Sequence, residues 1–524
     1  MSHDSHMASG RLLIKVAGVC GESHRLSGSC DKASLSPPSS PDVSRAPYFI
    51  LCKTFYGCLS EQTEANRTAL GLTLLRFSTA GGAACGGRAR LRGRHQARWF
   101  SLSKAHPILF RMLTSSSSGS QVIQNMEEGH FPIHVKNVRS KLREIVGAST
   151  NWRDHVQAMN ERKALDTLLA KTQADLPPRK MKDSYIEVIL PLGSQPEIRE
   201  KYLNMQNTVR FGRILEDLDS LGVLICYTHT KHEATLKSPL SIVTALVDKI
   251  GLWKQHIHPD CDIKFTGNVS WVGKTSMEVK IHMLQLLDGI YCPVLDATFV
   301  MVARDPENKR PAFVNPLIVE TPEEEKIFRE GEKNKIRRLE SSRASLLKVA
   351  PTEDERNIIH NIFLNTLDSR TVSFRSRILP PNSVWMQDTK LKGLEICHPQ
   401  ERNIFNRIFG GFLMRKAYEL GWATAYSYGN SRPYVVAVDD IMFQKPVEIG
   451  SLLLLSSQVC YTEKNNIQVR VHSEVYDPDT RVHHTTNVFH FTFMIEREIP
   501  DVVPKTYGES MLYLDGKRHF ENTA

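Results

Sequence analysis

The feature that most limits how this chain can fold is an internal repeat. A shift of 199 residues superposes QNTVRFGRILEDLDSLGVLICY (206–227) on FNRIFGGFLMRKAYELGWATAY (405–426). Both segments carry apolar residues at the spacing of a helix that opens just after a glycine. The coinciding positions are Asn207 with Asn406, Gly212 with Gly411, Leu221 with Leu420, Gly222 with Gly421, and Tyr227 with Tyr426. We therefore expect two copies of one structural unit.

The agreement extends to both sides of this helix. A short strand precedes it in each copy, and alternating apolar segments with hairpin turns follow it. The matching segments are 181–190 with 386–396, 245–250 with 437–442, 268–281 with 458–471, and 295–303 with 486–494. Each unit is thus predicted to be a strand, a long loop, a helix and several antiparallel strands. One long helix against such a sheet is an α+β arrangement, in which the sheet can wrap the helix.

The segments around the two units indicate the remaining organisation. TPEEEKIFREGEKNKIRRLESSRASLLK (321–348) has acids early and bases late, which suits the dipole of a solvated linking helix. Residues 136–170 are predicted to form a helical lead-in. The expected parts are a disordered leader at 1–130, a first unit with its lead-in at 131–310, a charged linker helix at 311–350, a second unit at 351–510 and a C-terminal tail at 511–524.

The net charge of +10 belongs mainly to the leader. Between residues 65 and 126 there are nine basic residues and no acid, whereas residues 1–64 are balanced, so residues 127–524 carry only about +1. This distribution argues against a nucleic-acid-binding body. The acid-poor, Arg- and Ser-rich segment resembles a mitochondrial transit peptide, although it lies far from Met1. The alternative is a plain basic tail.

Cysteines and apolar runs exclude two further classes. Cys226, Cys261, Cys292, Cys397 and Cys460 are isolated in sequence, without the paired spacing of a disulfide framework or a metal site. We expect them to be core residues in a reducing compartment. No uncharged apolar run reaches the roughly 18 residues that a membrane-spanning helix needs. We therefore expect no integral membrane segment.

The second copy carries a motif that identifies a family. NRIFGGFLMRKAYELGWATA, followed by VAVDDIMFQKPVEIGSLLLLSSQVCY, resembles the hot-dog acyl-CoA thioesterases, and the first copy is a more divergent version. The resemblance covers residues 135–510 and implies a tandem hot-dog fold. It also implies hydrolysis of acyl-CoA to a free fatty acid and CoA, in fatty acid metabolism, without a cofactor or metal. The resemblance further implies a mitochondrial location, most naturally the matrix. It also implies a homo-oligomer, a dimer or trimer of double hot-dog chains.

Thioester hydrolysis needs a base for the attacking water and donors for the oxyanion. In double hot-dog thioesterases the working site combines an Asn before one helix with an Asp on the other. That resemblance points to Asp219 as the general base, the Asn406 side chain as the group that holds the water or carbonyl, and Gly411 N–H as the oxyanion donor. Asn406 lies one residue further from the glycine than the family usually places this asparagine. Asn403 is therefore kept as the fallback.

The mirror-related site is expected to be degenerate, because Tyr418 occupies the slot of the acid opposite Asn207. Glu419 is its neighbour, but a helix turns about 100° per residue and aims it elsewhere. CoA carries phosphates, so cationic side chains are expected near the site. The candidates that flank the helix starts are Arg210, Arg213 and Arg407.

Other interpretations stay open at this point. Asp219 follows Asp217 and Glu216, and such a face of a helix is usually solvated. His398 and His490 are the histidines nearest the motifs, and a structural role is expected for each. Acyl-CoA hydratases share the fold but use an Asp-His pair near the helix start, where this chain has no His. A non-catalytic acyl-CoA binding or assembly protein is the remaining alternative.

Overall fold

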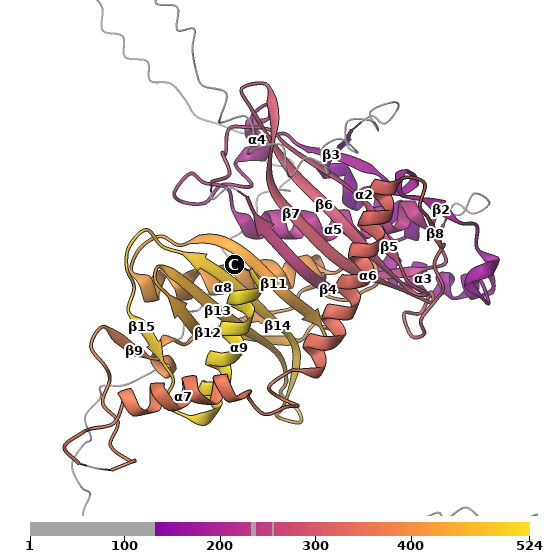
Figure 1. Ribbon diagram of the computed structural model, residues 1–524. Helices are drawn as coiled ribbons and strands as arrows, with labels where there is room; N and C mark the ends of the chain where they lie inside the picture. The colour runs from indigo at the N-terminus through magenta and orange to yellow at the C-terminus, as the bar shows by residue number, and fades with distance from the viewer. Residues whose placement is uncertain (1–131, 232–236, 254–255, 372, 524) are drawn as a thin grey trace, which may run out of the picture. The chain divides into compact units, whose positions relative to one another are not determined.

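The computed structural model describes residues 132–523, apart from 232–236, 254–255 and 372 (Figure 1). The predicted leader at 1–130 lies outside these residues. The main feature of the described part is one 11-stranded sheet in which the two units have the same strand order when read from opposite edges. The first half consists of β1 (Ile133–His134), β3 (Ile186–Leu190), β5 (Ile263–Val272), β6 (Ser276–Leu287), β7 (Ile290–Arg304) and β4 (Ser241–Leu252). The second half continues with β11 (Tyr434–Phe443), β14 (Val482–Met494), β13 (Asn466–Asp477), β12 (Leu452–Glu463) and β10 (Leu391–Ile396).

The repeated helices lie against one face of this sheet. They are α5 (Phe211–His229), which packs on β4 to β7, and α8 (Gly410–Gly429), which packs on β12 to β14. Sixteen of the 19 residues of α5 are buried. A helix that is buried on nearly every side belongs at the centre of a core rather than at its surface. The predicted α+β tandem hot-dog fold, an antiparallel sheet around a long helix in each unit, is confirmed.

Strands β4 and β11 join the units. These two strands are equivalent in the repeat and pair antiparallel with each other, with Val247 opposite Ile441 and Ile250 opposite Val438. The sheet is therefore continuous across the junction, and α5 and α8 contact each other on its inner face. This arrangement brings the start of α8 to the middle of α5.

Two further helices cover the outer face (Figure 1). Helix α6 (Pro322–Arg343) packs on β5, and helix α9 (Tyr507–Thr523) packs on β12. Gly331 of α6 lies against Trp271, and Gly516 of α9 lies against Cys460, so close that a Cβ atom on either glycine would meet its neighbour at 2.4 or 2.6 Å. Most of the expected C-terminal tail at 511–524 lies in α9, as a helix packed on the sheet. Because α6 and α9 pack on the equivalent strands β5 and β12, an outer helix is part of each copy of the repeat.

The lead-in forms a layer that only the first unit has. Helix α2 (Val135–Val146) buries Val138, Leu142 and Val146 against the core and contacts α5, and α3 (Trp152–Glu161) follows it. The segment before the second unit contains α7 (Glu353–Asn365), which has no buried residue. The remaining short elements are β2 (Arg179–Lys180), α4 (Pro196–Arg199), β8 (Leu317–Ile318), β9 (Ser383–Trp385) and β15 (Asp501–Val503).

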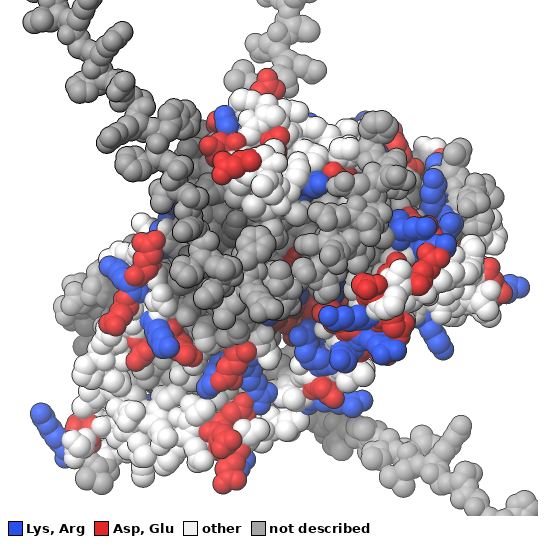
Figure 2. Space-filling view, turned by 45° about the horizontal axis from the view of Figure 1, so that its top comes forward, with Lys and Arg blue, Asp and Glu red and all other residues white. Residues whose placement is uncertain are grey.

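The charged residues of α6 hold it to the sheet. Arg338 donates to the fully buried carboxylate of Glu278 at 2.9 Å, and Arg337 and Arg338 both reach Asp248. On the face shown in Figure 2, basic and acidic side chains of the described residues are interspersed. Among the helices of the described residues, none has an apolar stretch long enough to cross a bilayer.

Candidate active site

The junction of the two central helices places one carboxylate at a helix start. Asp219 of α5 accepts a hydrogen bond from the backbone N–H of Gly411, in the first turn of α8, at 2.7 Å. Its other oxygen accepts the hydroxyl of Thr244 on β4 at 2.5 Å. The two copies of the repeat thus meet at this carboxylate, and Gly411 N–H, which the sequence analysis assigned to the oxyanion, donates to Asp219.

The Asp219 side chain is only 2% exposed. Burial raises the pKa of this carboxyl to about 6, even though the hydrogen bonds from Thr244 and Gly411 favour the charged form. A carboxylate with a pKa near 6 is mostly ionised at neutral pH and still basic enough to accept a proton. The interpretation of Asp219 as part of a solvated acidic face is therefore wrong.

A cavity of about 690 Å³ opens beside Asp219 and is lined by residues of both units. Asp219 is the one carboxylate among the described residues that line it, whereas six of them are basic. These basic residues are Arg139, Arg143, Arg304, Arg402, Arg407 and Lys445. Apolar side chains such as Val223 and Leu413 supply other parts of the wall. The cavity therefore suits a molecule that has an apolar part and an anionic part.

The structure separates the two asparagine candidates. Asn403 lines the cavity and accepts hydrogen bonds from the backbone N–H groups of Phe405 and Arg407 with its side-chain oxygen, which leaves its NH₂ group as the free donor. Asn406 is absent from the lining and sits in the turn with φ of +59°, a conformation that asparagine tolerates better than most residues. The turn explains the backbone of Asn406, whose side-chain oxygen is buried without a hydrogen-bond partner among the described residues, and the fallback residue Asn403 is the one that lines the cavity beside Asp219.

The three candidate cations also differ in position. Arg407 lines the cavity. Arg210 and Arg213 do not, because they flank the start of the other central helix, where Arg210 pairs with Glu419 at 2.7 Å and Arg213 with Glu216 at 2.5 Å. The five other basic residues of the wall come from α2, from the end of β7 and from loops of the second unit, and no local pattern singled them out.

The mirror-related position is filled by packed side chains. Tyr418 is buried, and its ring lies 5.2 Å from that of Phe211. Asn207 has φ of +57° in its turn, as Asn406 does. Glu419 pairs with the side chain of Arg210, the residue that precedes the first turn of α5. Tyr418 thus occupies the acid slot, as predicted, with aromatic packing in place of a carboxylate.

Thr244 is a site residue that sequence reasoning missed. The alignment of the two copies shows that the second copy lacks this hydroxyl. When 245–250 is aligned with 437–442, Thr244 falls on Val436. Asp219 falls on Tyr418 in the same way. The acid and its hydroxyl partner are therefore both present in the first copy and both replaced in the second, and this joint loss was the signal available in the sequence.

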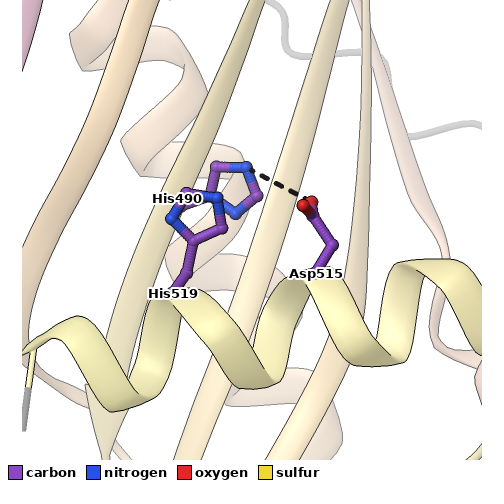
Figure 3. A group of neighbouring side chains, drawn as sticks. All are labelled: His490, Asp515 and His519. Carbon is purple, nitrogen blue, oxygen red and sulfur yellow. Dashed lines mark ion pairs between the residues drawn. The ribbon is translucent and has the colours of Figure 1, made fainter. Parts of the chain in front are cut away.

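The two flagged histidines lie away from the cavity. His398 is exposed before the turn at Pro399–Glu401. His490 is buried on β14 beneath α9, where its ring stacks on that of His519 at 3.7 Å and its Nε2 lies 3.9 Å from Asp515 (Figure 3). These three side chains could offer ligands to a metal ion. The imidazole planes, however, are only 19° apart, so their in-plane lone pairs run side by side rather than converge, and His519 already pairs with Asp439.

Known proteins resemble this chain over most of its length. A family model described as Thioesterase superfamily matches residues 405–482. The mitochondrial acyl-coenzyme A thioesterase 9 of Bos taurus is 70% identical over 411 residues, which cover 78% of this chain and 93% of the bovine protein. The Homo sapiens protein of that name is 71% identical over the same shares. The mitochondrial acyl-coenzyme A thioesterase 4 of Humulus lupulus is 36% identical over 66% of this chain and 67% of the plant protein. The chain therefore belongs to the mitochondrial acyl-CoA thioesterases.

Proposed function

We propose that the chain hydrolyses acyl-CoA thioesters at the cavity beside Asp219, with this carboxylate as the general base. Asp219 takes a proton from water while the water oxygen attacks the thioester carbonyl. The tetrahedral oxyanion then collapses, the C–S bond breaks, and the CoA thiolate receives a proton from Asp219. The products are a free fatty acid and CoA, and water is the only other reactant. The observation that carries this proposal is the contact between Asp219 and the start of α8.

The start of α8 supplies the donors for the oxyanion in this proposal. A helix N-terminus has free N–H groups and a partial positive charge. Gly410 is the first residue of α8 and lines the cavity, and its N–H donates to no described residue. Gly411 N–H was expected to bind the oxyanion, but in this structure it donates a hydrogen bond to Asp219. We assign the oxyanion to the Gly410 N–H, assisted by the NH₂ group of Asn403.

The chemistry of CoA supports the assignment of the basic wall. Arginine binds phosphate through paired N–H donors, and the cavity carries several arginines on the side of the lead-in and of the second unit. The names of the relatives describe them as mitochondrial. We further propose that this chain acts in the matrix and that double hot-dog chains assemble into a closed homo-oligomer.

The direct test is release of free thiol from acyl-CoA by the full chain, measured over a series of acyl lengths. Turnover that saturates with acyl-CoA is the expected result, and the length series reports how much acyl chain the cavity accepts. Saturable binding of acyl-CoA without thiol release would instead support the non-catalytic binding protein.

Replacing Thr244 with Val is expected to move the pH dependence of hydrolysis. Thr244 donates to the charged form of Asp219, so its loss raises the pKa of that carboxyl above about 6. Because the base works when ionised, the rising limb of log kcat/KM against pH shifts to higher pH, and activity recovers in alkaline buffer. Thr244→Ser, which keeps the hydroxyl, should retain the wild-type profile. A uniform loss at every pH would contradict this role for Thr244.

Replacing Tyr418 with Phe is expected to leave kcat and KM within about two-fold of wild type, because a group outside the reacting site contributes little to transition-state binding. The ring keeps its packing on Phe211, and only the hydroxyl is lost. Steady-state kinetics with acyl-CoA measures the effect. A loss of kcat clearly larger than two-fold at unchanged stability would show that the Tyr418 hydroxyl takes part in hydrolysis.

A further inference from the structure

A buried histidine in the cavity wall has no partner for either ring nitrogen. His155 of α3 is 1% exposed and lines the cavity. Neither its Nδ1 nor its Nε2 has a hydrogen-bond partner among the described residues. Buried polar groups are nearly always hydrogen-bonded, because an unmet one costs about 1–3 kcal/mol. Because His155 lines the cavity, we infer that its partner is a ligand bound there, which the ring meets after a small shift of the wall.

The charge state of His155 limits what that ligand group can be. Burial, together with the nearby positive charge of Arg402, lowers the pKa of His155 to about 4. The imidazole is therefore neutral at physiological pH, with one nitrogen as donor and the other as acceptor. Such a ring can donate to one ligand atom and accept from another, and adenine carries both a donor and acceptors along its edge.

Two arginines lie beside this histidine and face the same cavity. Burial and the charge of Arg143 both lower the pKa of Arg402, so the two guanidinium groups act on one another. Arg402 donates to the backbone oxygens of Thr150 and Pro399, which fixes its position between the lead-in and the second unit. Asp219 is the only carboxylate among the described residues of the cavity wall. Like charges held close in the wall of a cavity favour an anionic ligand.

We propose that His155, Arg143 and Arg402 form a subsite for the nucleotide end of CoA, with the phosphates on the arginines and the adenine edge on His155. The proposal rests on the proposed function, since acyl-CoA is the ligand. The subsite is built from the α2–α3 layer, and α7, which precedes the second unit, buries no residue. Among the described residues, the equivalent layer is therefore missing before the second unit, and the subsite shares its cavity with Asp219.

The test compares octanoyl-CoA with octanoyl-pantetheine, which lacks the adenosine and its phosphates. His155→Leu is expected to raise KM for octanoyl-CoA about ten-fold, the effect of one lost hydrogen bond to a buried partner, and to leave kcat unchanged. Kinetics with octanoyl-pantetheine should stay as in wild type. His155→Gln, which keeps a donor and an acceptor, should restore most of the KM. His360→Leu on the exposed face of α7 is the matched control and should leave KM and kcat unchanged for both substrates.

Equal increases in KM for both thioesters, or no increase for either, would overturn the subsite. Binding of adenosine 3′,5′-bisphosphate, measured by calorimetry, tests it without catalysis. The dissociation constant should rise about ten-fold in His155→Leu and recover in His155→Gln. If wild type released no thiol but this difference in binding persisted, the proposed function would fail while the subsite stood. Equal binding by wild type and His155→Leu would reject the subsite even in an active enzyme.

Discussion

Replacing Asp219 with Asn is expected to lower kcat for acyl-CoA hydrolysis by about 10²- to 10⁴-fold, the usual contribution of a positioned general base. The amide has nearly the shape of the carboxylate. Its oxygen can still accept from Gly411 N–H, and its NH₂ group can donate to the Thr244 hydroxyl, so the fold should persist. What is lost is the group that takes a proton from water. Thiol release under saturating substrate measures the effect, and thermal unfolding checks that the variant is folded.

Asp217→Asn is the matched control on the same helix. Asp217 accepts from the hydroxyl of Tyr202 at 2.6 Å, and burial raises its pKa to about 6, as it does for Asp219. Asp217, however, does not line the cavity. Its amide variant should therefore keep kcat near wild type. If both variants lost activity equally, or if Asp219→Asn stayed fully active, Asp219 would not be the base.

The second large effect is expected at Gly411. A Cβ atom on this residue would lie 2.8 Å from the backbone Cα of Glu216 and 2.5 Å from the ring of Phe409. The backbone of α5 cannot yield without moving α8 away from Asp219. A displaced α8 also carries the Gly410 N–H away from the oxyanion. Gly411→Ala should therefore lower kcat/KM by about 10²-fold or more, as the loss of an aligned oxyanion donor does, and destabilise the fold by about 1–3 kcal/mol, as overpacking does.

Gly212→Ala separates catalysis from general crowding. Gly212 is the equivalent glycine of the first copy, and a Cβ atom there would meet the flexible side chain of Arg415 at 3.0 Å and Tyr418 at 3.5 Å. Those side chains can shift, and they lie at the packed mirror position rather than at the cavity. Activity of Gly212→Ala should stay within a few-fold of wild type. A loss as large as that of Gly411→Ala would mean that helix packing alone explains both.

Much of the fold could be predicted because its signals are periodic and repeated. The buried pattern of 206–227 and 405–426 identified the two central helices, and the alternating strands beside them implied equivalent sheets. Helix α9 was missed. Its glycines at 508 and 516 weaken the local helical pattern, and Gly516 makes sense only against Cys460 on the outer face of the sheet.

The site was predictable in part. Asp219 stood out because the repeat places it opposite a tyrosine, and Asn403 was named beside Asn406. The choice between those asparagines depends on the turn, where Asn406 takes a left-handed backbone and Asn403 faces the cavity. His155 carried no signal, because a lone histidine on a helical lead-in is unremarkable until burial removes its contact with water.

By itself the sequence determined that the chain is built from two copies of a hot-dog unit, that its family hydrolyses acyl-CoA, and that one copy alone retains the acid. The tertiary structure decided which groups meet. Gly411 N–H reaches Asp219 across 192 residues, and His155 of the lead-in shares one cavity with Arg402 of the second unit. These contacts depend on the close approach of two helices and on the register of β4 with β11, which are set by packing between distant segments rather than by any local pattern of residues.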